Sequence, residues 1–227
     1  MNIPTRLDDL RGSEHVKRAI EVALTGFHTI ALYSTSNPLD MRAFALWLGR
    51  AGLTVYELTH CPCGNLGSAD IACTCTAAET YQHQRGGEYA FAQIHADIHI
   101  EVVAIPYEKL TGRKGESDER IIERVERARK VSVTLDLDST CLSLMKAAYR
   151  QLAMGSSVRY DSIIALAGTI AKMDGEKSIK ATYLAEALQY RPRRCEPSKP
   201  KEKTEDYLDE IAGYLKRLAE NAEERYK

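Results

Sequence analysis

The sequence predicts an α/β protein whose amino-terminal part holds a small sheet and whose second part is helical. Three short apolar runs, at residues 28–34, 53–60 and 96–105, are typical of buried strands. Helical patterns separate these runs, so we expect a minimal sheet of about three strands flanked by helices. After Pro106 the chain shows only helical patterns until a proline-rich charged segment.

Two helix starts stand out in the amino-terminal part. Residues 13–26 carry apolar side chains at helical spacing and predict a first helix. Asn37 suits the N-cap of a second helix, with Pro38 at its first position and Asp40 in its first turn. Beyond the second strand, Thr76 and Glu79 have capping-box spacing.

Changes in composition divide the chain into four segments. We expect an α/β domain over residues 1–110, a helical domain over 116–192, a linker over 193–203 and a terminal amphipathic helix over 204–227. The helical domain is expected to contain helices at 117–130, 139–154, 157–173 and 180–190.

Composition limits the function classes. The 227 residues are 44% hydrophobic and 28% charged, which is typical of a globular protein with a sizeable core. A formal net charge of −1 argues against binding nucleic acid or acidic lipid by overall charge. No apolar run approaches the roughly 18 residues of a membrane span, and the first residues lack a signal-peptide pattern. We therefore expect a cytoplasmic protein without membrane contact.

The strongest chemical signal is the segment "CPCGNLGSADIACTC" within a loop at residues 60–76. Two C-x-C pairs, Cys61 with Cys63 and Cys73 with Cys75, supply the four thiolates of a closed, structural zinc site. His60 or His83 is an alternative to one cysteine. The competing interpretation is four reduced thiols packed as small apolar side chains. Of the other two cysteines, Cys141 is expected in the core and Cys195 in the linker.

Four segments carry a further signal; in order they are "DDLRGSEHVKRAIEVALTGFHTIAL", "CPCGNLG…CTC", "DIHIEVVAIPYEKL…GESDERIIERVERAR" and "GTIAKMDGEKSIKATYLAEALQYRP". These segments resemble the magnesium-chelatase-like AAA+ ATPases, and within them the ComM-type branch. The resemblance covers most of residues 7–193 and implies an AAA+-like three-layer unit, a zinc loop and a helical lid.

The nucleotide loop departs from this family. A phosphate loop binds through glycines that bring backbone N–H groups close, a lysine that neutralises charge, and a hydroxyl that holds magnesium. Laid on the family pattern, the first glycine falls at Ser34, the lysine at Asp40 and the Ser/Thr at Met41, while Asn37 starts the helix. The comparison implies a degenerate loop and no bound nucleotide.

Other family positions depart as well. The segment between this loop and the cysteines is short, which leaves out the acidic magnesium-binding strand. Leu58 and Thr59 stand where the family has a polar sensor, and no arginine finger is present. The sensor arginine of the lid falls at Ser162, or at Arg159 after a small shift. These departures imply a pseudo-ATPase.

Three further groups of residues are candidates for weaker sites. Asp136 and Asp138 suggest either an acidic metal pair or a helix start capped by Asp138. His95, Asp97 and His99 would share one face of an extended strand, either as metal ligands or as solvated side chains. A basic run suggests either contact with nucleic acid or a partner, or a solvated linker; it comprises Arg191, Arg193, Arg194, Lys199, Lys201 and Lys203.

Three functions are compatible with the sequence. The first is a non-catalytic module that docks on a partner ATPase or self-assembles, with structural zinc and no nucleotide. The second is an ATP-dependent motor on DNA with a divergent nucleotide site. The third is a zinc-containing nucleic-acid-binding module. We expect the first, so a protein partner or self-association is favoured over DNA.

Overall fold

The computed structural model describes residues 6–10, 12–111, 115–152 and 156–192, which all belong to one compact unit, Met1–Cys195. In chain order the elements are η1 (Leu7–Asp9), α1 (Glu14–Gly26), β1 (Ile30–Thr35), α2 (Pro38–Arg50), β2 (Val55–Thr59), α3 (Ala77–Arg85), α4 (Gly87–His95), β3 (Ile98–Val103), α5 (Tyr107–Leu110), α6 (Asp118–Arg129), α7 (Ser139–Gln151), α8 (Ser157–Met173) and α9 (Ala181–Gln189). The predicted linker and terminal helix lie outside the described residues. The division of this unit into two domains stays a prediction.

The three predicted strands form one parallel sheet in the order β2-β1-β3. In its register, Ile30 pairs with Val55 on one side and with Ile98 on the other. All six residues of β1 are buried, as expected for the central strand of a sheet covered on both faces. The mixed α/β fold class and the small sheet are therefore confirmed.

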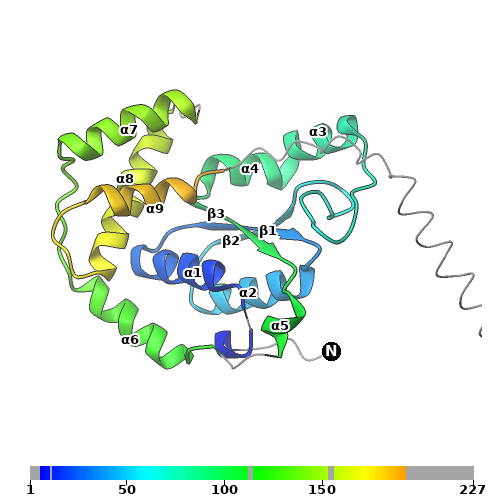
Figure 1. The fold of residues 1–227 in the computed structure, drawn as a ribbon, viewed down its shortest axis with the longest axis horizontal. Helices are drawn as coiled ribbons and strands as arrows, with labels where there is room; N and C mark the ends of the chain where they lie inside the picture. The colour runs from blue at the N-terminus through cyan, green and yellow to red at the C-terminus, as the bar shows by residue number, and fades with distance from the viewer. Residues whose placement is uncertain (1–5, 11, 112–114, 153–155, 193–227) are drawn as a thin grey trace, which may run out of the picture. The chain divides into compact units, whose positions relative to one another are not determined.

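Helices cover both faces of this sheet, and Figure 1 shows α1 and α2 on one side with α3 and α4 on the other. Alternation along β1 explains the two packing layers. Ile30 and Leu32 point into the main core, which continues through α1, α2 and the helices α6 to α9. Ala31 and Tyr33 point into a smaller cluster under α4.

The sequence rules for helix starts hold at three sites. The Asn37 side chain accepts a hydrogen bond from the Asp40 amide at 3.3 Å, with Pro38 in the first turn of α2. Thr76 and Glu79 form the reciprocal capping box of α3. Asp138 accepts from the Cys141 amide at 2.7 Å, so the cap interpretation of Asp138 is confirmed.

Helix α4 was not expected, and it overturns one candidate site. The prediction that His95 and His99 share a strand face is wrong, because His95 is the last residue of α4 and β3 begins only at Ile98. Tyr89 and Ala92 pack at helical spacing into the smaller cluster, which stabilises α4 although its sequence begins with two glycines. His99 is 6% exposed and therefore not solvated.

His99 is held neutral inside this smaller layer. Gln93 donates to the Tyr33 hydroxyl at 2.9 Å, so Tyr33 in turn donates to His99 Nδ1, also at 2.9 Å. His99 Nε2 then carries the proton and donates to the Ala96 carbonyl at 3.1 Å. Burial, with a smaller contribution from the Arg159 charge, lowers the pKa of His99 to about 3.

The buried imidazole predicts a specific loss of stability in mild acid. The unfolded chain binds a proton on His99 below its ordinary pKa of about 6.5, whereas the folded chain does not until about pH 3. Stability therefore falls as the pH drops through this window, by about 2 kcal/mol at pH 5 from this group. His99→Gln should be less stable at neutral pH but lose less free energy of unfolding between pH 7.5 and 5, measured in urea.

The matched control is His95→Gln, because His95 is exposed. It should keep the wild-type dependence on pH, including any part that comes from other groups. An identical loss of stability in wild type and His99→Gln would contradict the assignment.

Candidate functional site

The four predicted zinc ligands come together in the loop between β2 and α3. The Sγ atoms of Cys61, Cys63, Cys73 and Cys75 all lie within 4.8 Å of one another. Cys61 and Cys63 are separated by 3.4 Å, and Cys73 lies 3.6 Å from each of them. Four sulfurs bound at about 2.3 Å to a tetrahedral zinc ion lie roughly 3.8 Å apart, whereas a disulfide needs about 2.05 Å. The cluster therefore fits a metal ion.

Backbone amides donate to two sulfurs of this cluster. The Leu66 amide donates to Cys61 Sγ at 3.4 Å. Burial by itself raises the pKa of Cys63, but amides of Asn65 and Thr74 donate to its sulfur and bring the pKa down to about 6. Burial and the neighbouring thiols raise the pKa of Cys73 to about 12, because a second negative sulfur nearby is unfavourable. A divalent cation would remove that repulsion.

Neither alternative histidine ligand points at the sulfurs. His83 Nε2 donates to the Thr59 carbonyl at 2.8 Å. His60 stacks on Tyr33 with ring centroids 4.7 Å apart, and its Nδ1 lies 3.1 Å from the Tyr89 hydroxyl. A zinc ion here would be held by the four cysteines. No ligand position would remain open, so such an ion would have a structural role rather than a catalytic one.

The cysteine loop is tied to the loop that joins β1 to α2. The Ser36 amide donates to the Gly64 carbonyl at 3.3 Å, and its hydroxyl donates to the Asn65 side chain at 3.1 Å. Ser36 has a φ of 65°, which a non-glycine residue rarely adopts. Ordering of the cysteine loop therefore helps to hold Ser36 in this conformation.

The four residues placed by sequence at the family's phosphate site span the end of β1, the connection after it and the first turn of α2; residues 34–41 are called the β1–α2 loop below. Ser34 and Met41 are buried, at 2% and 8% exposure, and Met41 belongs to the main core. Asn37 donates from Nδ2 to the Asp40 carboxylate at 2.9 Å and to the Val103 carbonyl at 3.0 Å. The four side chains thus build a capped helix start and link it to the end of β3.

Backbone amides in this loop already have partners within the chain. The Asn37 amide donates to Ser34 Oγ at 3.2 Å, and the Asp40 amide to Asn37 Oδ1 at 3.3 Å. The Met41 amide begins the helical ladder on the Asn37 carbonyl. A phosphate in this loop would have to compete with each of these acceptors.

The two residues considered for the lid's sensor arginine lie at the amino ends of the strands. Arg159 donates to the carbonyls of Gln93 and Ala96, at 2.5 and 3.1 Å, and so binds the end of α4. Ser162 donates to Asp97 at 2.9 Å, just before β3. The β1–α2 loop follows the carboxyl end of β1, so neither side chain is directed at it.

The remaining candidates divide into described and undescribed residues. Cys141 is fully buried in the main core, as predicted. Arg191 donates to the Leu188 carbonyl at 2.7 Å. The rest of the basic run and the sixth cysteine lie outside the described residues, namely Arg193, Arg194, Lys199, Lys201, Lys203 and Cys195.

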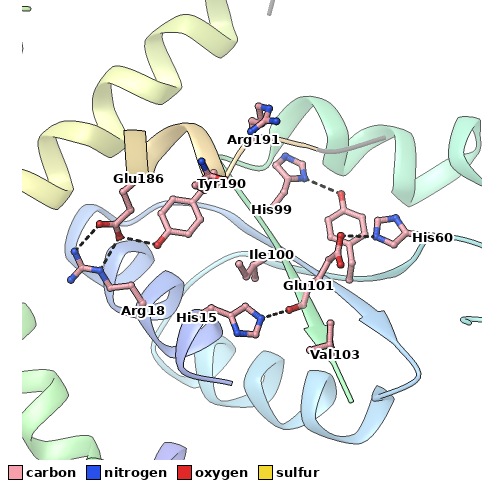
Figure 2. Close-up of a pocket in the computed structure, with 12 residues that line it drawn as sticks. His15, Arg18, His60, His99, Ile100, Glu101, Val103, Glu186, Tyr190 and Arg191 are labelled. Atoms are coloured by element: carbon pink, nitrogen blue, oxygen red, sulfur yellow. Dashed lines mark hydrogen bonds and ion pairs between the residues drawn. The ribbon is translucent and has the colours of Figure 1, made fainter. Parts of the chain in front are cut away.

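A groove along the outer edge of β3 was not anticipated from the sequence. It has a volume of about 540 Å³ and is lined by side chains of α1, β3 and the α9 end, as Figure 2 shows. Arg18 forms a paired contact with Glu186 at 2.8 and 3.2 Å, and Tyr190 donates to the same carboxylate. His60 Nε2 lies 3.7 Å from Glu101, too far for a hydrogen bond. The one sequence signal for this groove was the alternation of side chains along the third predicted strand, residues 96–105, which contains β3.

The cysteine geometry predicts bound zinc in protein prepared without added metal. Elemental analysis should find about one zinc per chain. Cys73→Ser should lose most of that metal and release the rest to a chelator faster, because three thiolates bind zinc less tightly than four. Cys141→Ala, which changes a core cysteine outside the cluster, should keep the full metal content.

Two results would contradict this assignment. One is a wild-type chain that is folded and free of metal. The other is a Cys73→Ser chain that holds as much zinc as wild type.

One comparison with known proteins matches part of the chain. Residues 126–191 match the family model described as magnesium chelatase, subunit ChlI C-terminal. The matched segment runs from the end of α6 through α7, α8 and α9, the helices predicted as the lid. No curated protein matches the chain. Among the described residues, no helix has the length and apolar character that crossing a membrane requires. Over these residues, the chain is similar to the carboxyl-terminal region of the magnesium chelatase subunit ChlI family.

Proposed function

We propose that the chain is a non-catalytic, AAA+-like module of the ComM-type branch that binds a partner or assembles with itself, and that it lacks a working ATP site. The observation that carries the proposal is the β1–α2 loop. Its side chains hold one another where the family pattern would hold a phosphate, and its helix start carries a carboxylate instead of an amine.

Electrostatics supports the absence of nucleotide binding. Asp40 occupies the position of the family's lysine and lies in the first turn of α2. A carboxylate about 4 Å from a phosphate charge is unfavourable by roughly 4 kcal/mol at an intermediate dielectric, where a lysine would be favourable by a similar amount. The favourable dipole at this helix start is also already engaged by the Asp40 carboxylate.

Hydrogen bonding supports the same conclusion. An amide that donates to a bound anion must be available to it. In this loop the amides of Ser36, Asn37 and Asp40 donate instead to Gly64, Ser34 and Asn37. Replacing Asp40 alone would leave these bonds in place.

The zinc loop fits a role in architecture. Zinc bound by Cys61, Cys63, Cys73 and Cys75 would order a loop that has few apolar side chains of its own, and Ser36 would connect that order to the β1–α2 loop. The zinc loop, the lid and the sheet would then keep the family's shape in the absence of nucleotide. Among the described residues, no contact favours the alternatives of a DNA motor or a nucleic-acid-binding module.

The proposal predicts that the chain does not bind Mg-ATP. Isothermal titration of wild type should give no binding isotherm, and no phosphate should be released in a turnover assay. Asp40→Lys should bind no better, because the loop amides remain engaged and the glycines are missing.

Asp40→Asn is the matched control, because it removes the charge but keeps the helix start. Micromolar binding with turnover by wild type would contradict the proposal. A gain of tight binding in Asp40→Lys alone would show that charge, rather than the closed loop, excludes the nucleotide.

A further inference from the structure

The two outer edges of the sheet differ in whether their backbone N–H and C=O groups have hydrogen-bond partners. On β3 three polar groups cover the edge, and they come from α1, from the residue before α2 and from the residue after α9. The His99 amide donates to the Tyr190 carbonyl at 2.8 Å, His15 Nε2 donates to the Glu101 carbonyl at 2.9 Å, and Asn37 donates to the Val103 carbonyl at 3.0 Å. Such caps keep a strand edge from pairing with another chain.

The edge of β2 is open over most of its length. The Ile30 amide donates to the Thr54 carbonyl, and Ile30 pairs with Val55 in the register. In a parallel ladder of this register Tyr56 and Leu58 bond to β1, so the N–H and C=O groups of Val55 and Glu57 turn outward. Among the described residues none donates to or accepts from these four groups. The edge ends at Thr59, whose carbonyl accepts from His83.

Apolar side chains flank this open edge on both sides of the sheet. On one face the α2 residue Leu46 is 37% exposed, one turn from Arg42, which contacts β2. On the other face Tyr56 packs against Phe91 with centroids 6.0 Å apart, and Phe91 is 51% exposed. Ile94, one turn further along α4, is 64% exposed. A strand added here would have apolar neighbours on both faces, as strands inside a covered sheet do.

The charges beside this edge suit a second copy of the chain. Arg42 pairs with Glu57 at the centre of β2. A two-fold axis normal to the sheet would place the Arg42–Glu57 pair of one copy beside the same pair of the second copy. Each Arg42 would then have a second Glu57 close by. Surfaces that pair with themselves must be self-complementary in this way.

We propose that two copies of the chain pair through antiparallel β2 strands about a two-fold axis at Tyr56, forming one continuous six-stranded sheet. In this register Val55 lies opposite Glu57 of the second copy, and the outward groups of both residues form four inter-chain hydrogen bonds. Tyr56 faces its own copy as a non-hydrogen-bonded pair, beside Phe91. The register also avoids placing the two Glu57 side chains directly opposite each other. The inference deepens the proposed function, on which it rests, by naming self-assembly and its surface.

The test is the mass of the full chain in solution, by sedimentation equilibrium over a range of concentrations, in wild type, Glu57→Pro and Glu57→Gln. Wild type should be a dimer. Proline at position 57 removes an outward N–H but no bond to β1, so the protomer should fold while its dimer dissociation constant rises at least about tenfold. Glu57→Gln keeps the N–H but removes the carboxylate beside Arg42, so it should weaken the dimer less than Glu57→Pro does.

A second variant tests the same surface in case the Glu57→Pro chain does not fold. Phe91→Lys changes an exposed side chain beside the edge and should also weaken the dimer, whereas Val158→Lys, at a 65% exposed position on α8, should not. A monomeric wild type would overturn the inference, and so would a dimer that neither Glu57→Pro nor Phe91→Lys weakens. Either result leaves the absence of Mg-ATP binding untouched, so failure here is distinct from failure of the pseudo-ATPase proposal.

Discussion

The structure depends on the burial of one strand. All six residues of β1 are buried, and β1 pairs with both other strands of the sheet. A parallel sheet of three strands with five or six residues each buries little surface by itself, so it is stable only if both of its faces are covered. The main core covers one face through α1 and α2, and the cluster under α4 covers the other. The arrangement of the rest of the described chain follows from this requirement.

The same requirement explains why the segment from β1 through α2 would persist without a nucleotide, as the proposed function requires. The strand, loop and helix from Ile30 to Arg50 contribute Leu32, Phe44 and Leu48 to the main core. Loss of this segment would expose the centre of the sheet. The loop itself contributes little to packing, and its chemistry is free to change provided that its backbone groups find partners. Asn37 supplies several of these partners, to α2 and to β3, and Ser36 adds the link to the cysteine loop.

Local rules made much of this fold predictable from sequence. The Asn37 cap, the Thr76–Glu79 capping box and the Asp138 cap depend on neighbours within three residues, and the structure contains all three. The four cysteines were also predictable as a cluster, because two C-x-C pairs in one short loop supply the four thiolates of a zinc site. Helix α4 was not predictable by the same means. Its glycine-rich start disfavours a helix, and its stability comes from Tyr89 and Ala92 packing under the sheet.

Features that join distant segments were likewise missed. The neutral state of His99 requires Tyr33 and Gln93 on two other elements, and the caps on β3 come from α1, the residue before α2 and the residue after α9. The spacing of residues along the sequence does not predict such contacts, because they depend on strand order and helix placement. The open edge of β2 became visible only when strand order showed which strands lie outermost.

Hydrogen exchange at the β1–α2 loop tests the central claim most directly. The claim is that acceptors within the chain bind the backbone amides of this loop. The amides of Asn37, Asp40 and Met41 should therefore exchange slowly in the free protein, and at the same rate with Mg-ATP in excess. Mass spectrometry of a peptide spanning residues 34–45 of the full chain measures this rate. Fast exchange that slows when Mg-ATP is added would contradict the account, because the loop amides would then be free to bind a phosphate.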